Sequence, residues 1–371
     1  MNKIGLYLHT PFCKSKCGYC DFYSYCGDAE QYDKYTDALC KRILFFGERF
    51  CREADTVYLG GGTPSLLGGE RLCKILETAK TAFRITEGAE ITLEANPADD
   101  LLNTLESVKN AGVNRLSLGV QSAVSDELKI LGRRHTNQDV VKTVADAKRV
   151  GIGNISCDLM LGIPNQTEKS LNESIDFLLT LEIPHISVYL LKIEQGTPFY
   201  QMADSLDLAD DDKAAALYLQ AAARLKEAGY EHYEISNFAK KGYESRHNLK
   251  YWNLEEYLGL GPAAHSFMEG KRFFFPRNTE EFIAENPPIA DGVGGAAEEF
   301  LMLSLRLSSG LSFSALESKY GITPTKEFNS FCEKLIKEGF AEKTFAGIRL
   351  TSKGFLMQNP IVLGVLESLG I

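Results

Sequence analysis

The sequence lacks the features that mark membrane-spanning and secreted proteins. It contains no apolar run of the roughly eighteen residues that a membrane-spanning helix needs. Its start, MNKIGLYLHTPFC, lacks the apolar segment of a secretory signal. We therefore expect a cytoplasmic protein without a transmembrane segment, whose cysteines are reduced thiols rather than disulfides.

The chain also lacks a surplus of positive charge. It has 50 Asp and Glu against 40 Lys and Arg residues, which gives a formal net charge of −10. A surface of this sign repels phosphate backbones, so nucleic acid is not expected as a partner. Hydrophobic residues at 44% and charged residues at 24% are typical of globular domains, so neither disorder nor a fibrous repeat is predicted.

Short apolar runs alternate with longer amphipathic stretches in the first half of the chain, which is the pattern of repeated βα units. Strands are predicted at residues 6–9, 56–59, 90–94, 115–119, 154–161 and 185–191, and helices at 32–48, 69–83, 99–110, 137–150 and 167–181. Most of these strands end in glycine or polar residues, so we expect their C-terminal ends to form one chemically active face. Six units are too few for a closed eight-stranded barrel. The sequence therefore predicts an α/β fold, a partial (β/α)6 TIM-like barrel open on one side.

Four parts are predicted along the chain. The barrel spans residues 1–205, and an extension with a helix at 213–228 spans 206–284. Residues 285–295 concentrate proline and glycine and are predicted to be a linker. The remainder, 296–371, predicts three short helices, a β-hairpin and a final helix, which together resemble a small winged-helix-like domain. Acidic and basic residues are balanced there, which favours a docking or lid role over DNA binding.

Three cysteines stand close together in a loop directly after the first predicted strand. Cys13, Cys17 and Cys20 have the spacing CxxxCxxC. Three thiolates at this spacing can bind three corners of a [4Fe-4S] cubane and leave the fourth iron without a protein ligand. A zinc site is the alternative, with Cys26 or His9 as the fourth ligand. The remaining cysteines are scattered and are interpreted as small packing residues: Cys40, Cys51, Cys73, Cys157 and Cys332.

This cysteine motif, with Tyr19 just before its last cysteine and a GGGTP run after the second strand, resembles the radical S-adenosylmethionine superfamily. In that superfamily S-adenosylmethionine binds the open iron, and one electron from the cluster splits its sulfonium to a 5′-deoxyadenosyl radical. Glycine backbone after the second strand permits close approach of a ligand. We expect S-adenosylmethionine contacts, most of them implied by the resemblance, from Tyr7, Tyr19, Gly61, Gly62, Thr63, Glu94, Gln121, Arg133 and Asp158. Arg134 competes with Arg133, because the two are adjacent.

Within the superfamily the chain resembles the HemW branch, the haem chaperones that are similar to oxygen-independent coproporphyrinogen III oxidases. The resemblance covers nearly the whole chain and makes its C-terminal domain HemN-type. Phe22 stands where the oxidases carry a fourth cysteine, and Cys13 lies almost at the start of the chain. Both departures favour the chaperone over the oxidase. The matching segments are HTPFCKSKCGYCDFYS, YLGGGTPS, LEANP, RLSLGVQS, LGRRH, DLMLGIP and HNLKYW.

The segment HNLKYW matches the HNxxYW motif that is proposed to bind haem in that branch. The resemblance implies haem contacts from His247, Tyr251 and Trp252, because imidazole is a usual axial ligand and aromatic rings pack against a macrocycle. The alternative interpretation makes His247 a hydrogen-bonded packing residue.

The implied function is to bind the cluster, S-adenosylmethionine and haem or another porphyrin, and to deliver haem to apo-proteins of the respiratory chain. Oxidative decarboxylation of coproporphyrinogen III and radical modification of haem are the alternatives. Whether the chain is an enzyme and whether it forms a homodimer are left open by the sequence.

Overall fold

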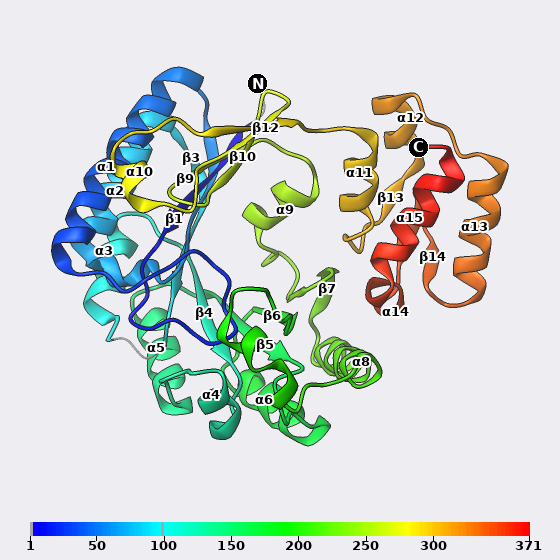
Figure 1. The fold of residues 1–371 in the computed structure, drawn as a ribbon, viewed down its shortest axis with the longest axis horizontal. Coiled ribbons are helices and arrows are strands. Elements are labelled where there is room, and N and C mark those ends of the chain that lie inside the picture. The colour runs from blue at the N-terminus through cyan, green and yellow to red at the C-terminus, as the bar shows by residue number, and fades with distance from the viewer. Residues whose placement is uncertain (1–2, 98–99) are drawn as a thin grey trace.

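Six parallel strands form the centre of the structure, and the helices that connect them pack on the outside (Figure 1). The structure is a computed structural model that describes residues 3–97 and 100–371. The parallel strands are β1 (Ile4–Thr10), β2 (Ala54–Gly61), β3 (Ile85–Ala95), β4 (Arg115–Gln121), β5 (Asn154–Leu161) and β6 (His185–Leu190). The connecting helices are α1 (Ala29–Phe50), α2 (Gly68–Phe83), α3 (Leu102–Asn110), α4 (Ser125–Ile130), α5 (Asn137–Arg149) and α6 (Glu168–Thr180).

The predicted α/β fold is confirmed. All six predicted strands form in the predicted order, and each is the parallel neighbour of the next from β1 to β6. The five predicted helices are found with their ends displaced by at most a few residues. Residue 99, the first residue of the helix predicted at 99–110, lies outside the described residues. The short helix α4 was not predicted, because it is too brief to show a helical period.

The segment after β6 extends this sheet at both edges. It begins with α7 (Pro198–Gln201) and the long helix α8 (Asp211–Glu227). At one edge, β8 (Asn237–Ala239) and β7 (Glu231–Glu234) follow β6 in antiparallel pairing. At the other edge, β9 (Tyr257–Leu260) pairs in parallel with β1. Beyond β9 come the antiparallel strands β10 (His265–Met268), β11 (Lys271–Phe274) and β12 (Ile289–Val293).

The sheet has twelve strands in the order β12-β11-β10-β9-β1-β2-β3-β4-β5-β6-β8-β7. Its two end strands, β12 and β7, are not paired with each other within the described parts of the chain, so the barrel stays open there. Strand β12 lies inside the segment predicted as a linker, and two short helices, α9 (Arg246–Trp252) and α10 (Thr279–Ile283), lie between the added strands.

Local sequence explains where the outer helices begin. Helices α1, α5 and α6 each start with a capping box, in which Asp28, Thr136 and Thr167 accept a hydrogen bond from the backbone N–H three residues later. Such a cap satisfies N–H groups that have no partner inside the helix. Strand residues such as Leu6 and Leu59 are fully buried under these helices. The apolar side chains thus cover the outer face of the sheet and leave its inner face for polar residues.

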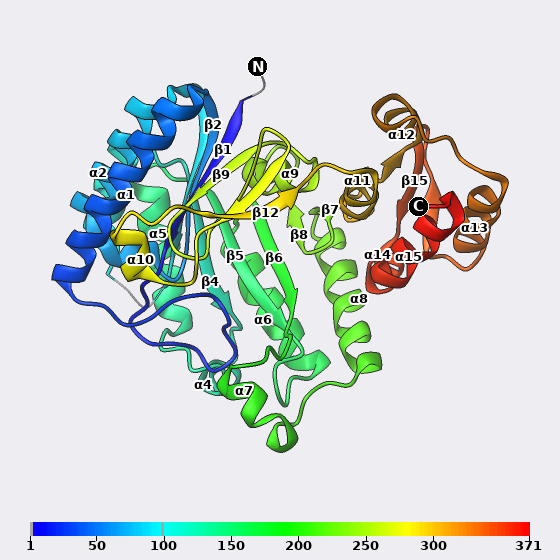
Figure 2. The ribbon, with the colours of Figure 1, turned by 45° about the horizontal axis from the view of Figure 1, so that its top comes forward.

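The C-terminal residues form a small separate unit beside α8 and α9 (Figures 1 and 2). The three predicted helices are α11 (Ala297–Ser304), α12 (Phe313–Tyr320) and α13 (Lys326–Lys337), and the predicted hairpin is β14 (Ala341–Lys343) with β15 (Gly347–Leu350). Strand β13 (Leu311–Ser312) pairs with β15, and α14 (Ser352–Leu356) and α15 (Gln358–Leu369) end the chain. No helix within the described residues combines the length and the apolar character needed to cross a bilayer.

Candidate cofactor site

The predicted cysteines and most of the predicted ligand contacts line one cavity of about 520 Å³. Cys13, Cys17 and Cys20 border it from the loop after β1. The cavity is also lined by eight of the nine residues predicted to contact S-adenosylmethionine, namely Tyr19, Gly61, Gly62, Thr63, Glu94, Gln121, Arg133 and Asp158. A volume of this size is typical of sites for small-molecule cofactors. Residues spread from position 13 to position 158 therefore meet in one place.

Backbone hydrogen bonds hold the cysteine loop in place. The Cys13 N–H donates to the Tyr25 carbonyl oxygen at 3.0 Å, and the Tyr25 N–H donates to the Pro11 carbonyl oxygen at 3.0 Å. The Thr63 hydroxyl lies 3.6 Å from the Cys13 sulfur. Burial raises the pKa of the Cys20 thiol, and negative charge on Cys17 or Cys13 would raise it further. Iron bound to the three sulfurs would oppose this rise in pKa, because a metal favours the thiolate form.

The glycines of the GGGTP segment let the loop after β2 lie directly against the cysteine loop. A Cβ atom on Gly62 would stand 2.4 Å from the Phe12 carbonyl oxygen, and one on Gly61 would stand 2.7 Å from the His9 ring. Gly61 also has a φ of +109°, a conformation that other residues rarely adopt. The sequence had suggested that these glycines admit a ligand; the structure adds that they are required for packing between the two loops.

The alternative of a single zinc ion receives no support from His9, one of the two residues considered as its fourth ligand. The Nδ1 atom of His9 is 3.0 Å from the Tyr7 hydroxyl, and its Nε2 atom is 3.0 Å from the Tyr23 carbonyl oxygen, so neither nitrogen is free. Within the described parts of the chain, no three His, Cys, Asp or Glu side chains are grouped around one metal-ion position. A cubane cluster makes a different demand, since each of its thiolates binds a separate iron atom.

Two acidic side chains face the cavity from neighbouring regions of the sheet. Glu94 accepts hydrogen bonds from the Tyr58 hydroxyl at 2.8 Å and from the Gly61 N–H at 3.0 Å. Burial, with a smaller contribution from the charge of Asp158, raises the pKa of Glu94 to about 7. Burial likewise raises the pKa of Asp158 to about 6, although nearby arginines oppose the rise. A cationic ligand would favour the ionised form of both carboxylates. S-adenosylmethionine, which carries an ammonium and a sulfonium group, fits this requirement.

Arg133 and Tyr19 form a second pair in the cavity wall. The Arg133 Nη2 atom donates to the Tyr19 hydroxyl at 2.6 Å, and its guanidinium carbon lies 5.9 Å from the centre of the Tyr19 ring. The adjacent Arg134 is exposed and borders only a smaller hollow of about 220 Å³ beside the cysteine loop. The structure therefore places Arg133, rather than Arg134, in the main cavity.

Buried polar atoms in the cavity wall lack partners among the described residues. They include the Oε1 atom of Gln121 and the Nε atom of Arg133. Gln121 is also a non-glycine residue with a φ of 66°, a conformation that costs free energy and occurs often at functional sites. Leaving such groups unsatisfied is unfavourable, so a polar ligand that bonded to them would be stabilised. The cavity thus fits the polar ligand that its cysteine loop implies.

Several residues that line the cavity below the strand ends were not predicted from the sequence. Every second residue of β4 lines the cavity, starting at the buried Arg115 and continuing through Ser117 and Gly119 to Gln121. Side chains of a strand alternate between its two faces, so these four share the inner face. The alternation was visible in RLSLGVQ and would have identified Arg115 and Ser117. Tyr58, Ser187 and Tyr189 are further missed residues.

Tyr7 is the predicted contact that the structure does not bring to this cavity. Its side chain points instead into a neighbouring cavity of about 480 Å³. There its hydroxyl is hydrogen-bonded to His9, and its ring lies 6.1 Å from that of Tyr58. Tyr7 therefore borders the neighbouring cavity rather than the cofactor cavity, and its contact with S-adenosylmethionine stays a prediction.

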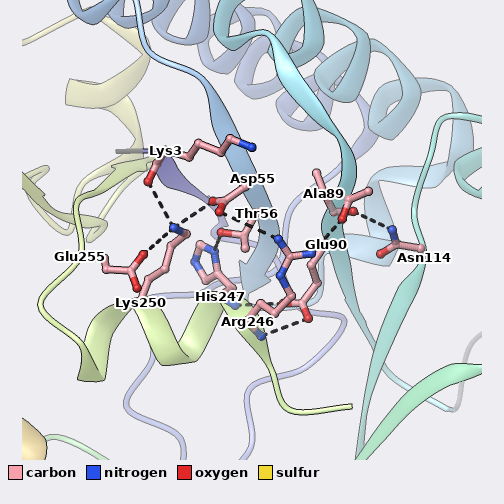
Figure 3. A network of polar contacts seen from close by, with 11 residues as sticks. Lys3, Asp55, Thr56, Ala89, Glu90, Asn114, Arg246, His247, Lys250 and Glu255 are labelled. Atoms are coloured by element: carbon pink, nitrogen blue, oxygen red, sulfur yellow. Dashed lines mark hydrogen bonds and ion pairs between the residues drawn. The ribbon is translucent and has the colours of Figure 1, made fainter. Parts of the chain in front are cut away.

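The HNxxYW segment forms helix α9 within a network of buried polar contacts (Figure 3). The Glu90 carboxylate accepts hydrogen bonds from the backbone N–H groups of Arg246 and His247 at 3.1 and 3.0 Å. The Lys250 ammonium lies 2.9 Å from Asp55 and 2.8 Å from Glu255. These contacts fasten α9 to the N-terminal end of β2 and to the middle of β3, away from the strand ends that carry the cysteine loop.

His247 itself is enclosed in this network. It is 1% exposed; its Nδ1 atom is 2.8 Å from the Thr56 hydroxyl and its Nε2 atom is 2.7 Å from the Tyr251 hydroxyl. Burial lowers the pKa of His247 to about 3, so the ring is neutral. With both nitrogens hydrogen-bonded, His247 has none free for haem iron in this structure. The alternative of a packing residue fits the observed geometry.

The other two residues predicted to bind haem, Tyr251 and Trp252, point in different directions. Tyr251 lines the neighbouring cavity that also contains Tyr7. The Trp252 ring lies 5.3 Å from the guanidinium carbon of Arg306, at the contact with the C-terminal unit. The three side chains predicted to bind haem therefore do not converge on a single site.

The chain carries a three-cysteine loop at the C-terminal strand ends of a partial (β/α)6 barrel, next to a polar cavity. This is the arrangement of a radical S-adenosylmethionine protein. In agreement, the model of the radical SAM superfamily matches residues 7–178, and that of the HemN C-terminal domain matches residues 296–357. The fold is similar to that of coproporphyrinogen III oxidase (HemN) from Escherichia coli, with a TM-score of 0.84 at 21% identity over 98% of this chain and 90% of the other. At that level of identity the likeness shows the fold alone.

Closer relatives identify the family. Heme chaperone HemW of Bacillus subtilis (strain 168) is 35% identical over 96% of this chain and 97% of its own length. Heme chaperone HemW of Lactococcus lactis subsp. lactis (strain IL1403) is 33% identical over 96% of this chain and 95% of its own length. The chain belongs to the HemW family of radical SAM proteins. Membership of that superfamily implies a [4Fe-4S] cluster and S-adenosylmethionine as cofactors.

Proposed function

We propose that this chain is a cytoplasmic haem chaperone. It binds a [4Fe-4S] cluster through Cys13, Cys17 and Cys20, holds S-adenosylmethionine at the open iron, binds haem, and passes the haem to apo-proteins of the respiratory chain. The observation that carries the proposal is the single cavity that joins the three cysteines to eight predicted ligand contacts. The names of the Bacillus and Lactococcus relatives extend it to haem. Assembly as a homodimer would be compatible with this function.

The protein's contribution to the cofactor site is binding and electrostatics. When bound, the cluster supplies one electron to the sulfonium of S-adenosylmethionine. Glu94 and Asp158 offer negative charge to the cationic groups of that ligand, and the unpaired Oε1 atom of Gln121 offers a hydrogen-bond acceptor. Arg133, held by Tyr19, supplies a fixed guanidinium for a carboxylate or hydroxyl. Each of these groups would stabilise the bound ligand whether or not it is cleaved.

Reconstitution of the cluster tests the first step. Anaerobic incubation with iron and sulfide should give about four irons per chain and a broad charge-transfer absorption band. Replacement of Cys13, Cys17 or Cys20 by Ala should abolish that band. Cys26→Ala is the matched control, because Cys26 is an exposed cysteine close to the same loop and its thiol donates to the Lys14 carbonyl oxygen. Equal loss in all four variants would contradict the proposed ligand set.

Haem transfer tests the chaperone function. The reconstituted chain, loaded with haem, should transfer it to an apo-cytochrome faster than free haem binds in the presence of a competing haem-binding protein. Coproporphyrinogen III oxidation is the second candidate, because it would use the same three-cysteine loop and the same cofactor cavity. Anaerobic incubation with coproporphyrinogen III, S-adenosylmethionine and a reductant distinguishes the two. Formation of protoporphyrinogen IX, read by fluorescence after oxidation, would replace the chaperone with the oxidase.

A further inference from the structure

A second cavity of about 480 Å³ lies next to the cofactor cavity and has aromatic walls. Tyr7, Tyr251, Tyr257 and Phe274 are among the residues that line it. Tyr251 and Tyr257 are packed edge to face, with ring centres 4.5 Å apart. Flat aromatic surfaces of this kind favour a flat aromatic ligand. The cavity therefore differs from its polar neighbour in the chemistry of the ligand it would accept.

The two cavities meet at the cysteine loop. Asp21 and Phe22, which directly follow Cys20, line both of them. Phe22 is 68% exposed, an unusual state for a large apolar side chain that stands at the wall of a cavity. A bound apolar ligand would cover this ring. Such a ligand would also lie close to the residues that hold the cluster.

His265 provides this cavity with an accessible imidazole. It lines the cavity, it is exposed, and its ring stacks on Phe274 with ring centres 5.1 Å apart. Neither of its ring nitrogens is hydrogen-bonded to any part of the chain that the structure describes. Stacking on Phe274 fixes the ring plane without using a nitrogen. His265 therefore has what His247 lacks, a nitrogen that can bind iron.

The other five histidines of the chain are committed elsewhere. Each of them is at least partly buried and has at least one ring nitrogen hydrogen-bonded to the protein: His9, His135, His185, His232 and His247. Among the six, His265 is thus the one that combines exposure with an aromatic cavity.

A cationic group stands at the same cavity. Arg277 is 53% exposed and is ion-paired with the Asp21 carboxylate. Its bonds to Asp21 come from Nη1 and Nη2. A guanidinium has five N–H donors, so donors remain for the carboxylates of a ligand. The cavity thus combines aromatic walls, an imidazole and an arginine, which are the groups that an iron porphyrin with carboxylate side chains requires.

We propose that this aromatic cavity is the haem site, with the His265 imidazole as an axial ligand to the iron and Arg277 beside the propionates. The inference rests on the proposed haem binding and assigns its location. On this assignment helix α9 supports the wall of the haem site, whereas its HNxxYW motif had suggested that it supplies the iron ligand. The hydrogen bond between Tyr251 and His247 holds the Tyr251 ring in the cavity wall, so His247 positions a wall residue and does not bind the iron.

The test is titration of the full-length, anaerobically reconstituted chain with ferric haem, followed by the Soret band and by electron paramagnetic resonance. His265→Gly should weaken haem binding about tenfold or more and should remove the spectral signature of a nitrogen ligand. Added imidazole should restore that signature in His265→Gly, which a purely structural role would not allow. Lys271→Ala is the matched control, because Lys271 is exposed on the same hairpin and does not line the cavity.

The outcomes separate the site from the function. If the wild-type chain binds no haem, the proposed function fails and this site fails with it. If the wild-type chain binds haem and His265→Gly has an unchanged affinity and Soret band, the site assignment alone is wrong. Loss of the nitrogen signature in His247→Phe but not in His265→Gly, with both variants folded by circular dichroism, would return the ligand to helix α9.

Discussion

Replacing Glu94 by Gln should stabilise the ligand-free protein at alkaline pH while weakening its binding of S-adenosylmethionine. Glu94 faces the cofactor cavity, and burial raises its pKa from 4.5 to about 7. The folded chain therefore holds this proton more tightly than the unfolded chain does. The stability that this provides is present at acid pH and is lost as pH rises through the folded-state pKa.

The size of the effect follows from the two pKa values. The difference between 4.5 and about 7 corresponds to about 3 kcal/mol, because one pKa unit is worth about 1.4 kcal/mol. The carboxylate retains some access to the cavity, and solvent there screens the charge, so we expect about 2 kcal/mol. Glu94→Gln removes the titrating group. Its free energy of unfolding should gain about 2 kcal/mol relative to wild type between about pH 5 and about pH 8.

Urea denaturation of the cluster-free chain, monitored by fluorescence of Trp252, measures this difference. Trp252 is the only tryptophan and lies in α9, which packs against β2. Glu87→Gln is the matched control, because Glu87 is an exposed residue of the same strand. Calorimetric titration should show weaker binding of S-adenosylmethionine by reconstituted Glu94→Gln. A difference from wild type that does not change with pH would refute the view that Glu94 is a destabilising buried carboxylate.

Two further predictions concern the cavity wall and helix α9. Arg133→Lys should lower the affinity for S-adenosylmethionine about tenfold, because Lys cannot reproduce the planar donors of Arg. Arg134→Lys is the control and should leave the affinity unchanged. Calorimetric titration compares the two variants, and equal effects would contradict the placement of Arg133. Lys250→Met should reduce the free energy of unfolding by about 3 kcal/mol, because Lys250 is 4% exposed and its loss leaves Glu255 without this ion pair and Asp55 with only the more distant Arg246, 3.9 Å away. Urea denaturation of Lys250→Met measures this loss, and Lys271→Met, at an exposed position, is the control. If the two variants had similar free energies of unfolding, the α9 network would contribute little to stability.

The order of strands and helices was predictable because each element carries its own local signal. Strand β5 was predicted at residues 154–161 and forms at Asn154–Leu161. Five of its eight residues are apolar and six of the eight are buried, as expected for a parallel strand that is covered by helices. By contrast, β9 lies within a glycine-rich segment and contains only four residues. Its pairing with β1 joins residues about 250 positions apart, and a short segment gives no local indication of such a partner.

The cofactor cavity was largely predictable because one geometric rule covers it. Parallel strands place their C-terminal ends on one face, so polar residues at several strand ends must meet there. Glu94 and Gln121 follow that rule, whereas Asp158 lies inside β5 rather than at its end. Arg115 does not follow it either, because it begins its strand and reaches the cavity from below as part of the inner face. Polar residues at strand ends therefore identify the part of the cavity nearest the strand ends. The deeper residues are found only from the alternation of side chains between the two faces of each strand.

Free imidazole nitrogens were harder to predict than the cavity, because the residue types alone do not reveal which nitrogen is hydrogen-bonded in the fold. His247 and His265 are the same residue type, and the motif around His247 makes it the more attractive candidate. In the fold, the hydroxyls of Thr56 and Tyr251 occupy both nitrogens of His247, while His265 stacks on Phe274 and keeps its own unused. Thr56 lies about 190 positions before His247, so only the folded chain brings this competing partner to the imidazole. Availability of a ligand atom is thus a tertiary property. The site of haem binding should be sought where an imidazole lacks a partner, rather than where a motif is most distinctive.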